Sequence, residues 1–420
     1  MREMKDSGIS WVGEIPKEWS VNRAKYCFVN TKEIAGCRSD RYERLALTMN
    51  GVIKRSKDDS NGLQPEKFET YQILRPNELV FKLIDLQNVS TSRVGLSSYL
   101  GLVSPAYIIL KSNKRVLPAF AEKYFLMLWK NQIFNALGDA GVRSNLNSKD
   151  LLELSIPFPS LAEQQKIAEF LDRECGKIDG LKADIQAQID TLEQYKRSVI
   201  TEAVTHGLNP SAPMKDSGAG WMPLIPLHWK ADKLKFHLRQ RGIKNQIDKQ
   251  VLSLYREYGI VPKDSRDDNH NVTSEDVSDY RYVRVGDFVV NKMKAWQGSV
   301  AVSNYEGIVS PAYFVYEFSD DLINKRYFHY LMRNKTYATE FRRLSGGIRE
   351  GQWDLPSEAL NNTIILLPPL VEQQEIADYL DNKCAEIEKI IADKKSQIET
   401  LDGYKKSLIF EYVTGKKEVV

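Results

Sequence analysis

The sequence predicts a mixed α/β (α+β) fold with two tandem globules, each followed by a long helix. Three observations predict it. The two halves of the chain repeat each other, the middle of each half mixes strand-like and helical stretches, and each half closes with a Gln-, Glu-, Lys-, Ile- and Leu-rich stretch. A chain of 420 residues exceeds what one hydrophobic core usually serves, so we expect each half to bury a core of its own.

The repeat consists of matching segments that follow in the same order in both halves. Residues 4–19 return at 214–229 with a shift of 210 positions. The later matches are 103–107 with 309–313, 163–178 with 372–387, and 195–196 with 404–405. Matches in one order at a nearly constant shift indicate an internal two-fold repeat. A chain built in this way should face a partner with approximate two-fold symmetry.

Each half opens with a segment marked by Trp and Pro, and its tryptophans are expected to anchor that segment. Strand-like runs follow, rich in β-branched and aromatic residues and bounded by Gly, Pro, Asn and Ser. Helical stretches interrupt these runs, which predicts a mixed α/β globule. The tryptophans are Trp11, Trp19, Trp221 and Trp229; the runs are 78–81, 102–110, 287–290 and 312–316; the helical stretches are 119–129 and 325–332.

Coiled-coil spacing begins at Leu161, and no proline follows until Pro210. Apolar residues at a mean spacing of about 3.5 predict two helices that pair along a seam. The predicted seam residues are Leu171, Ile178, Leu181, Ile185, Leu192, Tyr195 and Val199, and then Ile376, Leu380, Ile387, Ile390, Leu401, Tyr404 and Leu408. Polar residues at seam positions, Glu174, Gln188, Lys383 and Gln397, indicate that a further partner shares the seam.

Helices of roughly 45 residues would each be about 65 Å long, which suits a spacer. The predicted domains are a first globule (1–160), a spacer helix (161–205), a second globule (206–370), a second spacer helix (371–415) and a tail (416–420).

Positive charge is concentrated outside the helices. The chain carries +3 overall, whereas residues 161–205 carry −3 and 371–414 carry −4, which leaves +10 on the rest. This distribution suits a polyanionic partner, although a solvated surface without a partner would also explain it. No apolar run is long enough to span a membrane, so we expect a cytoplasmic protein. The four cysteines show no zinc-ligand spacing, and we expect buried free thiols.

The helix openings resemble a known family. Residues 368–381 read PPLVEQQEIADYLD, and residues 159–172 read PSLAEQQKIAEFLD, with Ser160 in place of the second proline. This doubled motif is similar to that of the specificity subunits of Type I restriction-modification enzymes. The segments 291–298 and 310–313 are similar to the family's target-recognition domains, from which 81–88 has drifted.

The resemblance implies a non-catalytic DNA-binding subunit. Each globule would read one half of an asymmetric bipartite site in double-stranded DNA, and the two helices would pair antiparallel and set the gap between the halves. Methyltransferase subunits, two in number, and motor-nuclease (restriction/translocase) subunits would dock on the chain. S-adenosylmethionine, ATP and Mg²⁺ would belong to those subunits, and this chain would bind no cofactor and no metal.

Basic residues on loops are the candidate DNA contacts. Arg143 and Arg349 follow Gly-Val and Gly-Ile at equivalent places, from which a guanidinium could reach phosphate or guanine. An arginine that ties its loop to its own domain is an equally good explanation. The other candidates are Lys292, Lys294, Arg239, Arg241 and Lys244. For the basic stretch that begins at Arg239, a solvated face is the favoured explanation.

Two alternatives from other classes remain at this point. One is a scaffold whose globules bind proteins or peptides, and the other is a stand-alone DNA enzyme. The segregated positive charge favours DNA over the scaffold. The sequence has no phosphate-binding GxxxxGK[ST], no GxGxxG, no HExxH and no Asn-Pro-Pro-aromatic motif, which disfavours the enzyme.

Overall fold

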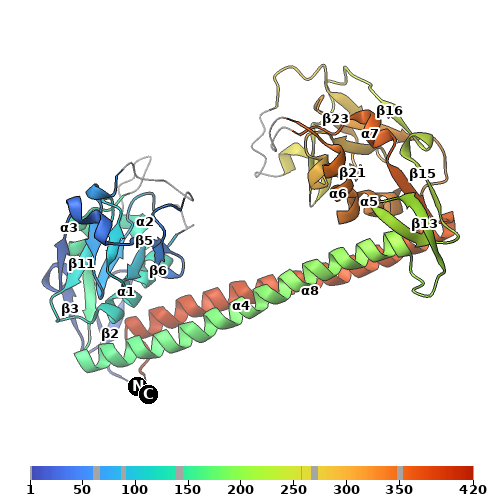
Figure 1. Cartoon of the computed structure of the whole chain (residues 1–420). Helices are drawn as coiled ribbons and strands as arrows, with labels where there is room; N and C mark the ends of the chain where they lie inside the picture. The colour runs from blue at the N-terminus through green and yellow to red at the C-terminus, as the bar shows by residue number, and fades with distance from the viewer. Residues whose placement is uncertain are drawn as a thin grey trace. The chain divides into compact units, whose positions relative to one another are not determined.

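The computed structural model describes residues 2–59, 67–86, 91–137, 145–256, 258–265, 273–347 and 353–419. The chain divides into two compact units. Unit 1 comprises Met1–Ile185 and Lys395–Val420, and unit 2 comprises Gln186–Lys394. These units differ from the predicted consecutive domains, because each contains part of both long helices (Figure 1). Within the described ranges, no helix combines the length and apolar character that a membrane crossing requires.

Unit 1 is an α/β globule with two four-stranded sheets. One sheet has the order β4-β11-β8-β9 and the other β6-β5-β10-β7, with two further strand pairs, β1-β2 and β12-β3. The strands are β1 (Met4–Asp6), β2 (Glu14–Pro16), β3 (Ser20–Arg23), β4 (Phe28–Thr31), β5 (Arg44–Thr48), β6 (Gly51–Arg55), β7 (Gln72–Leu74), β8 (Glu78–Phe81), β9 (Val94–Leu96), β10 (Gly101–Val103), β11 (Ile108–Ser112) and β12 (Ser155–Phe158). The helices are α1 (Pro118–Lys130), α2 (Ile133–Leu137), α3 (Ser148–Glu153), η1 (Ala24–Tyr26), η2 (Gly36–Arg41) and η3 (Phe68–Thr70).

Unit 2 repeats this plan with different residues. Its four-stranded sheet β16-β23-β20-β21 corresponds to β4-β11-β8-β9, and the pairs β17-β18 and β19-β22 correspond to the second sheet of unit 1. The strands are β13 (Met214–Ala219), β14 (Met222–Pro226), β15 (Lys230–Lys233), β16 (Leu238–Arg241), β17 (Leu252–Tyr255), β18 (Gly259–Pro262), β19 (Arg281–Val283), β20 (Phe288–Asn291), β21 (Val300–Val302), β22 (Gly307–Val309), β23 (Tyr313–Phe318) and β24 (Ile364–Leu367). The helices are α5 (Lys325–Arg333), α6 (Lys335–Leu344), α7 (Ser357–Asn361), η4 (Leu234–Phe236), η5 (Lys263–Ser265) and η6 (Ala295–Gln297).

The central strands β8 and β20 are buried along their whole length, which suits their apolar and β-branched residues. Each unit buries a large apolar cluster that includes the tryptophan of its opening segment, Trp19 at 1% exposure and Trp229 at 0%. The mixed α/β fold and the anchoring role of these two tryptophans are therefore confirmed.

The long helices are α4 (Leu161–His206) and α8 (Leu370–Val413), which lie within two residues of the predicted bounds. They pair antiparallel within each unit. In unit 1 the Asp179 carboxylate accepts a hydrogen bond from Lys405 at 2.7 Å, and Lys182 pairs with Asp402. In unit 2 Lys394 donates to the amide oxygen of Gln188, and Lys196 pairs with Glu388.

One of the two predicted seam rows is right and the other is wrong. The right row, with a spacing of seven, is buried or half-buried throughout and contains Leu171, Ile178, Ile185, Leu192, Leu380, Ile387 and Leu401. Tyr195 and Tyr404 were expected beside this row, but they are 48% and 57% exposed. The second buried row lies four residues after the first and not three, and contains Cys175, Lys182, Ile189, Lys196 and Ala203 in α4.

Lysines can take seam positions because their alkyl stems pack while the ammonium group reaches an acid on the other helix. Tyr195 and Tyr404, which are exposed, therefore lie outside both buried rows. Three of the four cysteines, Cys27, Cys175 and Cys384, are buried free thiols as expected, whereas Cys37 is exposed.

Helix glycines should limit the stability of α4. A Cβ built at Gly180 or at Gly403 in α8 would have no neighbour within 4 Å. We expect Gly180→Ala to raise the free energy of unfolding by about 1 kcal/mol, because glycine loses more backbone entropy in a helix. Denaturant unfolding measures this change, with Ala183→Gly on the same exposed helix segment as the opposite control. A lower stability for Gly180→Ala would contradict an open position.

Candidate nucleic-acid interface

The repeated Glu-Gln-Gln motif joins each long helix to its globule. In unit 1 the Trp19 indole Nε1 donates to Glu163 at 2.9 Å, and Arg2 donates to the same carboxylate at 2.5 Å. The amide of Gln164, which is fully buried, accepts from the Leu117 backbone N–H at 2.8 Å and donates to the Pro159 carbonyl. Leu117 precedes α1, so this glutamine satisfies a backbone group at the start of that helix.

Unit 2 contains the same joint. The Trp229 indole donates to Glu372 at 3.0 Å, and Gln373 accepts from the Asn324 backbone N–H at 2.8 Å, directly before α5. His228 contacts the Glu372 carboxylate at 2.7 Å, where unit 1 has Arg2. The motif therefore fixes the angle between helix and globule. The Glu-Gln-Gln motif is therefore explained by its structural role in both units and needs no contact with DNA.

The far end of each long helix closes the other unit. The α8 end enters unit 1, where Thr414 is fully buried and Lys416 donates to the Glu14 carbonyl at 3.0 Å. The α4 end enters unit 2, where Gly207 lies against Trp229. Both chain ends lie together at unit 1, as the N and C marks in Figure 1 show. Each unit is therefore completed by a segment that is distant in the sequence.

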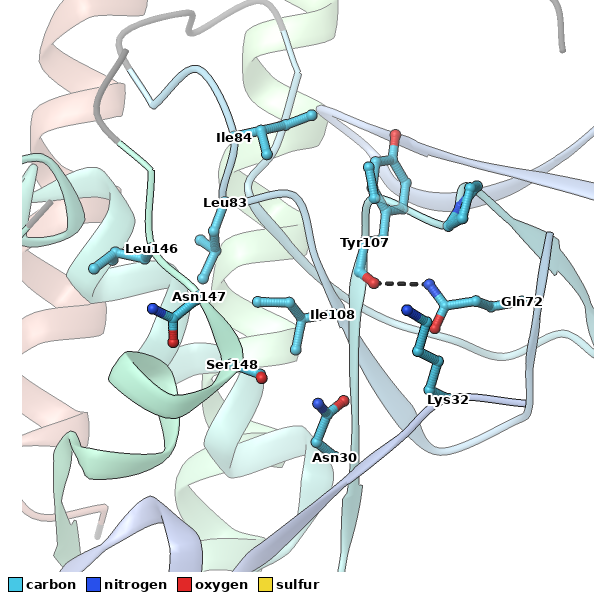
Figure 2. A pocket seen from close by; sticks show the side chains of 12 residues that line it. Asn30, Lys32, Gln72, Leu83, Ile84, Tyr107, Ile108, Leu146, Asn147 and Ser148 are labelled. Atoms are coloured by element: carbon cyan, nitrogen blue, oxygen red, sulfur yellow. Dashed lines mark hydrogen bonds between the residues drawn. The ribbon is translucent and has the colours of Figure 1, made fainter. Parts of the chain in front are cut away.

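A groove of about 240 Å³ lies on the surface of unit 1 (Figure 2). The Ser104–Tyr107 turn forms one wall, because the Tyr107 backbone N–H donates to the Ser104 carbonyl at 3.1 Å before β11 begins. The buried Gln72 amide holds this turn from below through bonds to both carbonyls, at 3.1 and 2.8 Å. The complete lining consists of Asn30, Lys32, Gln72, Leu83, Ile84, Pro105, Ala106, Tyr107, Ile108, Leu146, Asn147 and Ser148.

The strand registers identify the equivalent surface of unit 2. Tyr313 follows the same turn, and the Arg281 guanidinium donates to its carbonyl at 2.6 Å, at the place of Gln72. The Pro-Ala-Tyr turn, the leucine at 146 and 355 and the serine at 148 and 357 are the same in both units, whereas the other positions differ. The equivalent residues are Gln240, Gly242, Arg281, Lys292, Met293, Pro311, Ala312, Tyr313, Phe314, Leu355, Pro356 and Ser357.

Neither set contains an aspartate or a glutamate, and each contains basic or amide side chains. In unit 1, Lys32 and Asn30 are exposed at the rim. Beside the groove, burial and the nearby Arg93 guanidinium lower the pKa of Lys82. Side chains of these types contact phosphate oxygens and base edges in protein–DNA complexes.

The structure places the predicted DNA-contacting residues in different surroundings. Arg143 and Arg349 lie outside the described residues. Lys292 lies on the equivalent surface of unit 2, with its ammonium 3.0 Å from Asp354, and Lys294 is exposed nearby. Lys244 pairs with Asp279 at 2.7 Å on the surface.

The two arginines of the basic stretch differ in exposure and in partners. Arg239 is exposed on β16 opposite Glu317, in agreement with a solvated face. Arg241 is 9% exposed and pairs with Asp287 and Glu317. Burial raises the pKa of Asp287 although Arg241 opposes this. A guanidinium held inside the domain by two carboxylates is unavailable to DNA, so Arg241 is removed from the candidate contacts.

Trp296 has a packing role. Its ring centroid lies 5.6 Å from that of Trp353, its indole donates to the Met293 carbonyl at 3.1 Å, and the Arg342 guanidinium lies above both rings. The residues that sequence reasoning missed are Lys32 and Asn30 in unit 1 and Gln240 in unit 2. An aligned repeat could have found them, because they change beside a turn that stays the same.

The chain thus contains two copies of one α/β unit, with equivalent surfaces beside the same Pro-Ala-Tyr turn. The family model for the Type I restriction modification DNA specificity domain matches residues 53–191 and 243–400. These segments make up more than half of the chain, which therefore belongs to that family.

Curated relatives match over nearly the whole length. The putative type I restriction enzyme MjaX specificity subunit of Methanocaldococcus jannaschii is 22% identical over 447 residues, covering 97% of this chain and 96% of its own. The type I restriction enzyme EcoKI specificity subunit of Escherichia coli K12 is 21% identical over 407 residues, covering 87% and 84%. A solved structure from work on the assembly and conformational transition of the type I R-M system has a TM-score of 0.67 at 12% identity and covers 96% of this chain and 99% of its own. It shares the fold.

Proposed function

We propose that this chain is the DNA-specificity subunit of a Type I restriction-modification enzyme. Unit 1 reads one half of an asymmetric bipartite site in duplex DNA, unit 2 reads the other half, and the α4–α8 pair keeps the two readers apart. The observation that carries the proposal is the repeated surface beside the Pro-Ala-Tyr turn, which keeps that turn in both units while most of the side chains around it differ. A DNA site with two different halves requires two domains of the same fold whose contacting side chains differ.

The proposed partners are two methyltransferase subunits, with restriction/translocase subunits joining through the complex. An exposed row with a spacing of seven recurs on both long helices: Leu181, Gln188, Tyr195 and Glu202 on α4, and Ile390, Gln397 and Tyr404 on α8. In unit 1, Leu181 and Tyr404 lie at one level of the helix pair, since Asp179 and Lys182 contact Lys405 and Asp402 there. They are 53% and 57% exposed.

Unit 2 has the equivalent pair, Tyr195 and Ile390, at 48% and 39% exposure. Ile390 also lines a groove of about 420 Å³ together with Gln188 and Leu192. Exposed apolar residues that recur in both copies fit one partner that is bound twice. We therefore assign one methyltransferase to each pair.

The chain itself is proposed to be non-catalytic. The described residues contain no group of three His, Cys, Asp or Glu side chains that could hold a metal ion. S-adenosylmethionine, ATP and Mg²⁺ are assigned to the partner subunits. Cytoplasmic action follows from the proposed DNA target.

The test of this function is reconstitution. The purified chain with S-adenosylmethionine should leave DNA unmethylated, and addition of the cognate methyltransferase should produce adenine methylation at one bipartite motif, detected by methylation sequencing. Replacing both residues of one pair by glutamate, Leu181 with Tyr404, should reduce the bound methyltransferase from two copies to one in native mass spectrometry. Lys389→Glu, on another exposed face of α8, is the control and should keep two. Methylation by the chain alone, or without a divided motif, would refute the proposal.

A further inference from the structure

Each unit contains a two-stranded antiparallel hairpin, β5-β6 in unit 1 and β17-β18 in unit 2. In unit 1, β5 and β6 pair from Arg44–Arg55 to Thr48–Gly51. In unit 2, β17 and β18 pair from Leu252–Pro262 to Tyr255–Gly259. The two hairpins occupy equivalent places. In unit 1, Arg44 of β5 pairs in parallel with Leu102 of β10, the strand that follows β8 and β9. In unit 2, Val251, directly before β17, pairs in parallel with Ile308 of β22, the strand that follows β20 and β21.

The inward faces of the two hairpins match. Leu45 and Leu47 are 3% and 4% exposed and pack in one apolar cluster with Val80. Leu252 and Leu254 are 2% and 7% exposed and pack in the equivalent cluster of unit 2. Both hairpins therefore have the same buried base.

The tips do not match. Unit 1 carries Met49 and Asn50 there, whereas unit 2 carries Arg256 and Tyr258, with residue 257 outside the described residues. Met49 is 50% exposed and Tyr258 is 56% exposed. The buried leucines of the hairpin are therefore the same in both units, whereas the exposed residues at its tip differ. The buried part supports the fold, and the tip is free to differ between the two half-sites.

Both tips are held in a defined conformation. In unit 1 the Thr48 hydroxyl accepts from the Asn50 backbone N–H at 3.2 Å and donates to the Gly51 carbonyl at 3.0 Å. Gly51 has φ +88°, a left-handed conformation that glycine adopts without strain.

Unit 2 holds its tip from outside the hairpin. The Arg333 guanidinium of α5 donates to the Arg256 carbonyl at 2.7 Å, and Gly259 has φ +73°. The rings of Tyr255 and Tyr258 lie edge to face at 6.4 Å between centroids. A rigid, exposed tip loses little conformational entropy on binding.

A two-stranded ribbon fits the major groove of B-DNA, where each base pair presents its own pattern of donors, acceptors and methyl groups. We infer that each hairpin tip enters a groove of duplex DNA and selects base pairs of its own half-site, through Met49 and Asn50 in unit 1 and Arg256 and Tyr258 in unit 2. Asn50 has the amide that pairs with adenine, Arg256 has the fork that pairs with guanine, and Met49 offers an apolar surface to a thymine methyl group. This inference rests on the proposed function and adds a second reading element to the surface beside the Pro-Ala-Tyr turn.

The experiment uses the full chain in complex with its methyltransferase subunits and compares methylated motifs. Met49→Ala with Asn50→Ala should relax or change one or two positions of one half of the motif and leave the other half intact. Tyr258→Ala should do the converse. On duplexes that carry the wild-type motif or single-base changes in it, discrimination should fall roughly tenfold at the affected positions.

Matched controls come from an exposed aromatic residue at equivalent places in η1 and η4. Tyr26 is 55% exposed and Phe236 is 60% exposed, so they resemble Met49 and Tyr258 in exposure. Tyr26→Ala and Phe236→Ala should leave both halves of the motif unchanged. The salt dependence of binding should also stay the same in the hairpin variants, because base contacts release no counterions.

The outcomes separate the inference from the proposed function. If the wild-type complex gives no divided motif, the proposed function itself fails. If it gives one but the hairpin variants methylate the same motif with undiminished discrimination, only the hairpin inference is overturned. Two further results would also overturn it: loss of binding to random duplex as well, which indicates a phosphate contact, or loss of the methyltransferase from the complex, which indicates a protein contact.

Discussion

Trp229→Ala is expected to lower the free energy of unfolding by about 4 kcal/mol, since truncation of a buried tryptophan leaves a large cavity. The indole is fully buried and is one of the two groups bonded to the Glu372 carboxylate, with His228. Its loss therefore also removes a donor from a partly buried charge. Denaturant unfolding followed by tryptophan fluorescence and circular dichroism measures the change.

Two comparisons make this prediction specific. Trp229→Phe keeps most of the packing and loses the N–H donor, so it should cost less than half as much as alanine. Trp296→Ala removes a half-buried ring whose neighbour is Trp353, and should cost less than Trp229→Ala. Equal losses of unfolding free energy for Trp229→Ala and Trp296→Ala would show that the contact between Trp229 and Glu372 does not stabilise the attachment of α8 to its globule.

Gly415→Ala is expected to cost about 3 kcal/mol, through overpacking and a strained backbone. A Cβ at this position would lie 2.4 Å from Pro16 and 3.0 Å from the Trp19 ring, and φ is +72°. The end of α8 should detach from unit 1, and limited proteolysis should then remove it faster. Gly403→Ala in the same helix, with an open position, should raise stability by about 1 kcal/mol. Undiminished stability of Gly415→Ala would show that the helix end does not complete unit 1.

The sequence predicts the repeat, the mixed α/β fold and both long helices because these features follow from spacing along the chain. It cannot choose between two adjacent seam rows. The rejected row contains Leu181 and Tyr195, which are more apolar than Lys182 and Lys196 in the buried row. The choice depends on acids across the helix pair, such as Asp402 for Lys182, which a single helix does not reveal.

The candidate site was less predictable. Its groove combines β4, β7, β11 and the start of α3, which are distant in sequence, and Asn30 and Lys32 have no motif of their own. Arg241 shows the converse problem. A basic residue in a basic stretch resembles a DNA contact until the carboxylates of Asp287 and Glu317, 46 and 76 positions away, are found beside it.

In the proposed function the helix pair spaces two independent readers. One heptad inserted after Ile185 of α4 and one after Lys394 of α8 would preserve the seam spacing and leave the contacts inside each unit as they are. Seven residues add about 10 Å of helix, which corresponds to about three base pairs at 3.4 Å each.

Methylation sequencing of cells that carry this variant with its methyltransferase is the most direct measurement. We expect both half-sequences to stay the same while the unspecified gap between them lengthens by about three base pairs. An unchanged gap with full methylation, or a change in either half-sequence, would contradict this role of the helix pair.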